Sequence, residues 1–174
     1  LYGRAELLDA LPPFLTGGSM ITRVELQDAD YMPAPIKFEA GTQRVSQVVA
    51  FAEAVRYLQH LGMDNVHAWE QELGARLVAG VQNIEGVRLL GPTDPNKRAG
   101  LVSLGIDGVH PHDAGQLLDT KGIAVRVGHH CAQPLHRGAG LTASTRASAY
   151  LYNTTEDIDA FLSALAEVRP YFGL

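Results

Sequence analysis

Apolar residues recur at helical spacing in three long stretches of this 174-residue chain. From Thr42 to Gly62, the recurring positions are Val45, Val48, Val49, Ala52 and Val55. In the next stretch, which Asp64 can cap, they are Val66, Trp69, Leu73, Leu77 and Val81. From Thr154 to Arg169 they are Ile158, Phe161, Leu162, Leu165 and Val168. Side chains three and four positions apart share one helix face, so the pattern predicts three amphipathic helices, the last with a capping box at Thr154 and Asp157.

Shorter apolar and β-branched runs predict strands. They are VRLLG at 87–91, LVSLGI at 101–106, IAVRV at 123–127 and RASAYLYN at 146–153. HDAGQLLDTKG at 112–122 fits a helix that Gly122 ends, and the stretch rich in glycine and proline at 17–41 is expected to be irregular. Strands and helices mix from about residue 63 onward. We therefore expect an α/β fold in two parts, residues 1–62 and residues 63–174.

Composition and charge exclude several classes of protein to which the chain could belong. A formal charge of -5 argues against a nucleic-acid partner, which requires a basic surface. The chain has neither an apolar run of about 18 residues nor a leader, so no membrane association is expected. One cysteine in 174 residues is typical of a reducing cytoplasm. Because the chain opens at Leu1 without a methionine, it is expected to be a segment of a longer protein.

The single cysteine, Cys131, lies in the sequence RVGHHCAQPLHRGAG at 126–140. Histidines and arginines surround it, namely Arg126, His129, His130, His136 and Arg137. Nearby positive charge favours the thiolate, which is the nucleophilic form of the side chain. Gly128 before the motif and Pro134 after it place Cys131 on a loop at the end of a strand. The sequence therefore makes Cys131 a candidate nucleophile.

Other interpretations of this region remain open at this stage. Cys131 could be a partly buried cysteine beside histidines that only complete hydrogen bonds. His110, His112, His129, His130 and Cys131 could supply metal ligands, but adjacent extended residues point to opposite faces and the usual ligand spacings are absent. We therefore expect no metal site. A thiol protease is disfavoured, because no asparagine or aspartate is obviously placed to orient a histidine.

Four motifs together resemble one enzyme family. RVGHHCAQPL and STRASAYLYNTTEDIDAFL look like the C-terminal signature of the group II (SufS-type) cysteine desulfurases, and GGSMI at 17–21 and FEAGT at 38–42 match the same family in the expected order. The resemblance covers essentially the whole chain. It implies the C-terminal part of a fold-type I transferase dependent on pyridoxal 5'-phosphate (PLP). Residues 1–62 would be the tail of its large domain with the start of the interdomain helices, and residues 63–174 its small domain.

The resemblance assigns roles to individual residues. Such enzymes take sulfur from L-cysteine, yielding alanine and a persulfide for iron–sulfur cluster assembly, and Cys131 would receive that sulfur. Arg146 would bind the substrate carboxylate through a two-pronged ion pair. Arg126 and His130 match residues that line or support the same cavity. On sequence alone, Arg146 is an arginine at a strand edge, a position where arginine is more often structural than functional.

Thr42 and Gly41 match residues that contact the cofactor. They precede a predicted helix, whose N-terminus favours an anion. In the family, the threonine reaches the PLP phosphate of the neighbouring subunit, which implies a homodimer with composite active sites. Without the resemblance, Thr42 is only a helix N-cap.

The same resemblance indicates what the chain lacks. The Schiff-base lysine would lie upstream of Leu1, and Lys37, Lys97 and Lys121 do not match it. The segment alone is therefore expected to be inactive. Selenocysteine lyase activity and a PLP-free module that only relays sulfur remain as alternatives.

GVHPHDAG at 108–115 suggests a partner. It resembles the family branch that passes sulfur to a zinc-containing acceptor protein of the SUF pathway. The histidine matching His112 can bind the acceptor's zinc in that branch. From the sequence alone, His112 is a surface histidine at the start of a helix.

Overall fold

The computed structural model describes residues 2–174, and the chain divides into two compact units, Leu1–His60 and Leu61–Leu174. The division falls two residues before the boundary expected from the sequence. Both helices and strands are present, so the α/β class is confirmed. Within residues 2–174, no helix combines the length and apolar content needed to cross a bilayer.

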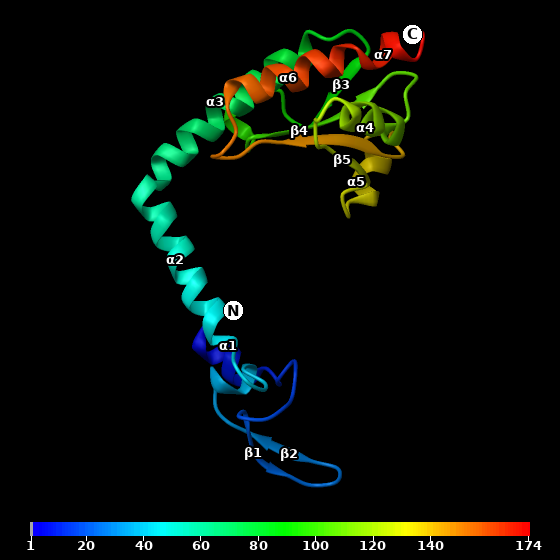
Figure 1. The fold of residues 1–174 in the computed structure, drawn as a ribbon. Coiled ribbons are helices and arrows are strands. Elements are labelled where there is room, and N and C mark those ends of the chain that lie inside the picture. The colour runs from blue at the N-terminus through cyan, green and yellow to red at the C-terminus, as the bar shows by residue number, and fades with distance from the viewer. Residues whose placement is uncertain (1) are drawn as a thin grey trace. The chain divides into compact units, whose positions relative to one another are not determined.

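The first unit contains little regular structure. Helix α1 (Ala5–Ala10) is followed by the antiparallel hairpin of β1 (Ile21–Val24) and β2 (Ala29–Tyr31), the short helix η1 (Ile36–Phe38) and helix α2 (Val45–Leu61) (Figure 1). Met20, just before β1, is fully buried. The hairpin lies in a stretch that the sequence predicted to be irregular. Its strands have only four and three residues, which is too short for a clear alternation of apolar and polar positions, and the prediction missed them for this reason.

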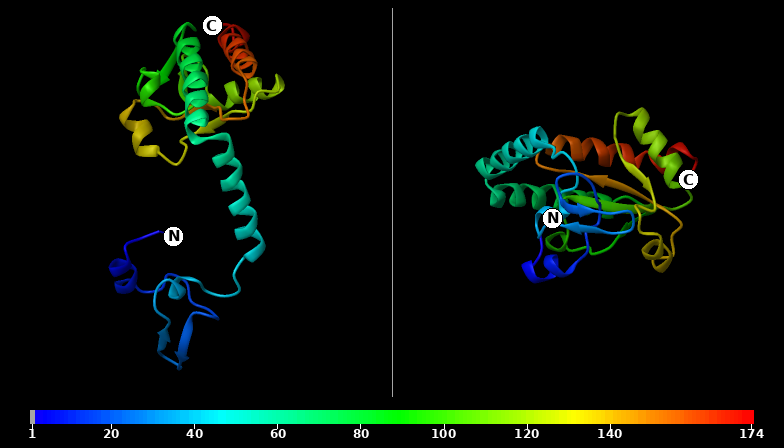
Figure 2. Two further views of the ribbon diagram at one scale, coloured as in Figure 1. Left: turned by 90° about the vertical axis from the view of Figure 1, so that its left-hand side faces the viewer. Right: turned by 90° about the horizontal axis from the view of Figure 1, so that it is seen from below.

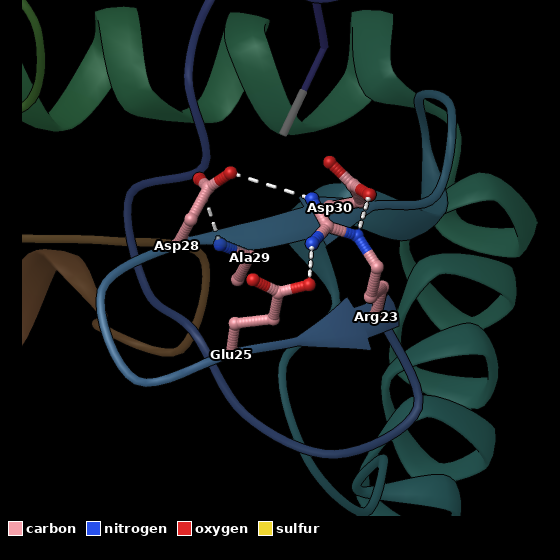
Figure 3. A network of polar contacts seen from close by, with 5 residues as sticks. All are labelled: Arg23, Glu25, Asp28, Ala29 and Asp30. Carbon is pink, nitrogen blue, oxygen red and sulfur yellow. Dashed lines mark hydrogen bonds and ion pairs between the residues drawn. The ribbon is translucent and has the colours of Figure 1, made fainter.

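Arg23 organises the hairpin by binding acidic side chains (Figure 3). Its Nε donates to Asp30 Oδ2 at 2.6 Å, and its two terminal nitrogens contact Glu25 and, at 3.4 Å, Asp28. The hydrogen bond from Arg23 lowers the pKa of Asp30. All four side chains are substantially exposed, so we expect the network to orient the strands rather than to contribute much stability.

Helix α2 differs from its sequence prediction at its start. It begins at Val45 rather than near Thr42, and it ends at Leu61, next to the predicted stop at Gly62. Its apolar stripe has the expected spacing, but α2 buries none of its residues within the described chain, and Val45, Val48 and Val49 are each more than 60% exposed. The periodicity therefore predicted the helix correctly without predicting burial.

The second unit is an antiparallel sheet with helices on one face. The sheet consists of β3 (Val87–Leu90), β4 (Leu101–Ile106), β6 (Ser144–Ser148) and β5 (Arg126–Gly128), in that spatial order. Helices α3 (Met63–Gln82), α4 (Pro111–Thr120) and α6 (Thr155–Ala166) cover one face, and α3 and α6 run side by side (Figure 2). The short elements η2 (Pro95–Lys97), α5 (Gln133–Gly138) and α7 (Val168–Tyr171) complete the unit.

The core of this unit lies between the sheet and the three helices. Val102 and Leu104 of β4 are fully buried, and their partners across the sheet, Ala147 and Thr145 of β6, are also buried. The face of α3 predicted from the sequence packs here: Leu73, Leu77 and Val81 are at most 1% exposed. Alternate residues of a strand point to opposite faces, so the neighbouring positions Ser103 and Arg146 lie on the face that these helices leave open.

Several predicted boundaries change in this unit. Gly62, with φ at 84°, is the N-cap of α3 in place of Asp64, which lies in the first turn. The strands predicted at 123–127 and 146–153 are shifted to Arg126–Gly128 and Ser144–Ser148. The ends of a strand are determined by its pairing with neighbouring strands, which local composition does not reveal. The capping box of Thr154 and Asp157 is present as predicted.

Candidate functional site

Cys131 lies on a tight turn between β5 and α5. The backbone of His130 and Cys131 is left-handed, with φ values of 51° and 60°. Two consecutive residues with a Cβ in this region are unusual, since each costs roughly 1–2 kcal/mol, and such strain concentrates at functional sites. The thiol is exposed as a result of this turn. The backbone here is built to present Cys131 rather than to pack it, which argues against a cysteine kept for the core.

An open hollow adjoins the thiol. Its lining consists of Arg126, Val127, His129, His130, Cys131, Gln133 and Pro134. Three of the predicted site residues, Arg126, His130 and Cys131, therefore share one surface depression. Arg146 does not line the hollow itself but is Arg126's direct partner in the neighbouring strand.

Arg126 and Arg146 face each other across β5 and β6. Directly opposed residues of antiparallel strands point to the same side, and like charges in this arrangement repel. No salt bridge to a carboxylate is formed by either guanidinium within residues 2–174. The Nε of Arg146 is buried without a hydrogen bond in the same part of the chain. The pair can accept an anion such as a carboxylate, which would relieve the repulsion and satisfy this donor.

His130 and His136 are joined through Ser144. Nε2 of His130 lies 3.0 Å from Ser144 Oγ, and Nε2 of His136 lies 2.9 Å from the same oxygen. Ser144 is fully buried and His136 is 6% exposed. The sequence analysis did not single out Ser144, and it treated His136 only as a nearby positive group. Ser144 is two residues before Arg146 in β6, and this period of two is the signal that could have placed it on the same face.

The surroundings of His130 favour its neutral form. Burial lowers the pKa of its imidazole, and the positive charges of Arg146, His136 and Arg126 lower it further. A neutral imidazole has one nitrogen with a free lone pair, so it can accept a proton. His130 therefore combines the chemistry of a base with a place beside an exposed thiol.

Thr42 and Gly41 lie in the first unit, on the bend that precedes α2. Thr42 is exposed and three residues before Val45, so it is not the N-cap that the sequence predicted. Gly41 has φ at 79°, which favours glycine, and its amide already donates to Gly18 O at 2.8 Å. Thr42 differs from Gly41, because neither its amide nor its hydroxyl makes a hydrogen bond within residues 2–174. Any anion contact here would come from Thr42 itself.

His112 is an exposed residue in the first turn of α4. Its backbone amide donates to Nδ1 of His110, the N-cap, at 3.3 Å, and the two rings stack with centroids 5.2 Å apart. The sequence placed His112 at a helix start correctly, but it did not reveal that His110 is the cap. The stacked pair leaves His112 on the surface, where a partner can reach it.

Comparison with known proteins adds independent findings. The family model described as aminotransferase class-V matches residues 1–161. A Mycobacterium leprae protein named "Probable cysteine desulfurase 2" is 51% identical over 173 residues, which are 99% of this chain and 41% of that protein. A Streptomyces coelicolor protein named "Probable cysteine desulfurase" is 48% identical with the same coverage. The chain thus spans roughly two fifths of the length of these relatives.

Solved structures give the same result. The chain resembles the cysteine desulfurase CsdA from Escherichia coli with a TM-score of 0.88 and 33% identity, over 98% of this chain and 42% of that one. It resembles the apo cysteine desulfurase from Thermococcus onnurineus NA1 with a TM-score of 0.89 and 36% identity, over 99% and 42%. The names of these proteins agree with the family that the sequence motifs resemble.

Proposed function

This chain belongs to the aminotransferase class-V family, and on that premise we propose that it is the C-terminal part of a PLP-dependent, group II cysteine desulfurase. Residues 1–62 would complete the large domain, and residues 63–174 would form the small domain. The observation that carries the proposal is the exposed Cys131, held on a left-handed turn beside two opposed arginines that have no carboxylate partner in residues 2–174.

The residues of this chain bind the substrate and receive its sulfur. Arg146, supported by Arg126, holds the carboxylate of L-cysteine, and this orients the substrate sulfur toward Cys131. The cofactor, when bound, supplies the electron sink that weakens the substrate's carbon–sulfur bond. The Cys131 thiolate attacks that sulfur and becomes the persulfide, and alanine is the other product. The open hollow at Cys131 lets the persulfide be collected from solvent.

The chain offers a contact for the cofactor phosphate but not the lysine that binds the cofactor covalently. Each of its three lysines already has an oxygen partner: Lys37 Nζ lies 2.7 Å from Asp9 O, Lys97 Nζ 3.8 Å from Asp94, and Lys121 Nζ 2.5 Å from Glu167. None of the three matches the Schiff-base lysine of the family, so we propose that this lysine lies in a part of the enzyme outside residues 1–174. The Thr42 hydroxyl fits a phosphate oxygen, and the family resemblance assigns that phosphate to the neighbouring subunit of a homodimer. A single cysteine, which cannot form a disulfide within the chain, suits a reducing compartment, so we propose a cytoplasmic enzyme.

The proposal is tested by comparing the intact protein with residues 1–174 alone. With PLP and L-cysteine, the intact protein should form alanine and carry an extra sulfur atom on the Cys131 peptide, as measured by amino-acid analysis and mass spectrometry. Residues 1–174 alone should do neither. Alanine formation by the segment alone, or none by the intact protein, would contradict the proposal. If the intact protein made no alanine but accepted sulfur from a persulfide donor, it would be a sulfur relay, and faster turnover of selenocysteine would make it a selenocysteine lyase.

We further propose that the sulfur acceptor is a zinc-containing protein of the SUF pathway, and that His112 binds its zinc. His112 is exposed, and its ring is not needed for the helix cap, because the capping hydrogen bond comes from its backbone amide and the ring only stacks on that of His110. In the intact enzyme, His112→Ala should lower the acceptor-dependent rate of sulfur transfer at least about tenfold, since even the loss of a contact that supports a metal ligand typically costs 10- to 100-fold. His67→Ala, at an exposed histidine of α3, should keep the wild-type rate. An unchanged rate in His112→Ala would remove this role.

A further inference from the structure

Ser144 connects two imidazoles with one hydroxyl group. Its Oγ is within hydrogen-bond distance of Nε2 of both His130 and His136, from the loop and from α5. A serine hydroxyl has one proton to donate, so it cannot donate to both rings at once. One ring must receive the Ser144 proton, and the other must donate its own.

The backbone decides which ring donates. Nδ1 of His136 lies 3.0 Å from the carbonyl oxygen of Ala132, and a carbonyl can only accept. In neutral His136 the ring proton is therefore on Nδ1, and Nε2 accepts from Ser144. Ser144 Oγ must then accept from Nε2 of His130. This direction places the ring proton of neutral His130 on Nε2 and leaves the lone pair on Nδ1.

Nδ1 of His130 is the end of this chain of hydrogen bonds. It is buried and has no hydrogen-bond partner within residues 2–174. His130 directly precedes Cys131, and both residues line the same hollow. The two side chains are not hydrogen-bonded in residues 2–174, so proton transfer between them requires the exposed Cys131 side chain to turn toward Nδ1.

The charges around this nitrogen keep it unprotonated at rest. Burial lowers the pKa of His130, the charges of Arg146 on β6 and Arg126 on β5 lower it further, and protonation of His136 on α5 would act in the same direction. His129 is the remaining titratable neighbour, in edge contact with His136 at 6.0 Å between ring centroids. The same positive groups stabilise a thiolate, so they favour moving the proton off sulfur and onward to solvent.

We propose that Ser144 and His136 are positioning residues that hold His130 as the Nε2–H tautomer, so that His130 Nδ1 accepts the proton of the Cys131 thiol. In this step the S–H bond breaks and an N–H bond forms, giving a thiolate and an imidazolium, with no change in oxidation state. The imidazolium then releases its proton to water once movement of the Cys131 side chain uncovers Nδ1, which is buried at rest. The inference rests on the proposed function only in taking the Cys131 thiolate as the attacking group.

The tautomer can be read without any substrate. In the intact protein carrying ¹⁵N-labelled histidine, the His130 ring nitrogens should give the signals of a protonated Nε2 and an unprotonated Nδ1 at neutral pH. Ser144→Ala should convert this to a mixture of tautomers, and Ser144→Thr, which keeps the hydroxyl, should restore it. A protonated Nδ1 in the wild-type protein would overturn the proposal without any variant.

The consequence for Cys131 is read from its alkylation by iodoacetamide at a series of pH values, followed on the Cys131 peptide by mass spectrometry. At pH 7, Ser144→Ala and His136→Phe should each react about tenfold more slowly than wild type, a modest fraction of what a positioned base contributes. Ser144→Thr should recover most of the rate. A Ser144→Ala profile that superimposes on wild type would overturn the proposal. Because alkylation needs neither cofactor nor turnover, this outcome is distinguishable from a failure of the proposed desulfurase activity.

Discussion

Replacing Cys131 by serine is expected to reduce alanine formation from L-cysteine by the intact enzyme by more than about 100-fold, since removing a catalytic nucleophile typically has effects of this size or larger. Serine has nearly the same size as cysteine, but its hydroxyl cannot accept sulfur to form a persulfide. Because the Cys131 side chain is exposed and is not among the core residues of the described part of the chain, the variant should fold as wild type does. Alanine release and the mass of the residue 131 peptide give the measurement.

A neighbouring substitution separates the nucleophile from the loop that carries it. Leu135→Ala changes a side chain that is 72% exposed on α5, so it should keep the wild-type rate. Cofactor absorbance should be equal in both variants and in the wild type. If Cys131→Ser retained more than a small part of the activity, the sulfur would be taken by another group and the central assignment would be wrong.

Replacing Arg146 by alanine is expected to lower kcat/KM for L-cysteine about 100-fold, the range seen when one partner of a desolvated charge pair is truncated. Arg146→Lys should recover only part of this loss, because an ammonium cannot form the two parallel hydrogen bonds that a guanidinium makes to a carboxylate. Steady-state alanine formation at varied substrate concentration provides the measurement.

Thermal unfolding distinguishes this role from a structural one. Arg146 faces Arg126 directly, so removing its charge relieves a repulsion, and the Tm should stay level or rise. A structural arginine would instead lower the Tm when removed. Arg88→Ala, at an exposed position of β3, which β4 separates from β6, serves as the matched control and should leave kcat/KM unchanged. A fall in Tm with unchanged kcat/KM for Arg146→Ala would exclude substrate binding.

Features that depend on neighbouring residues were predictable from the sequence. The buried face of α3 follows from apolar residues at helical spacing, and the start of α6 follows from the reciprocal hydrogen bonds of Thr154 and Asp157. Gly128 and Pro134 predicted the loop that carries Cys131, because glycine and proline interrupt regular structure. Each of these signals is complete within a few turns of helix or one loop.

Features that depend on pairing between distant segments were not predictable. The opposition of Arg126 and Arg146 requires the register of β5 against β6, which no local pattern determines. The link from His130 through Ser144 to His136 requires that register and the fold of α5 together. The exposure of α2 could not be predicted from the sequence either. An apolar stripe indicates that a helix face can pack against something, but it does not show what packs there.

The single tryptophan of residues 1–174 gives this segment an intrinsic fluorescence signal. Trp69 is partly buried on α3, and its indole N–H donates to Asn153 O at 3.1 Å, close to the start of α6. Intrinsic fluorescence excited in the indole band will therefore follow the unit that carries Cys131 and not residues 2–60. Comparing that signal with far-ultraviolet circular dichroism, which samples every helix, can reveal whether the two units melt together or in sequence.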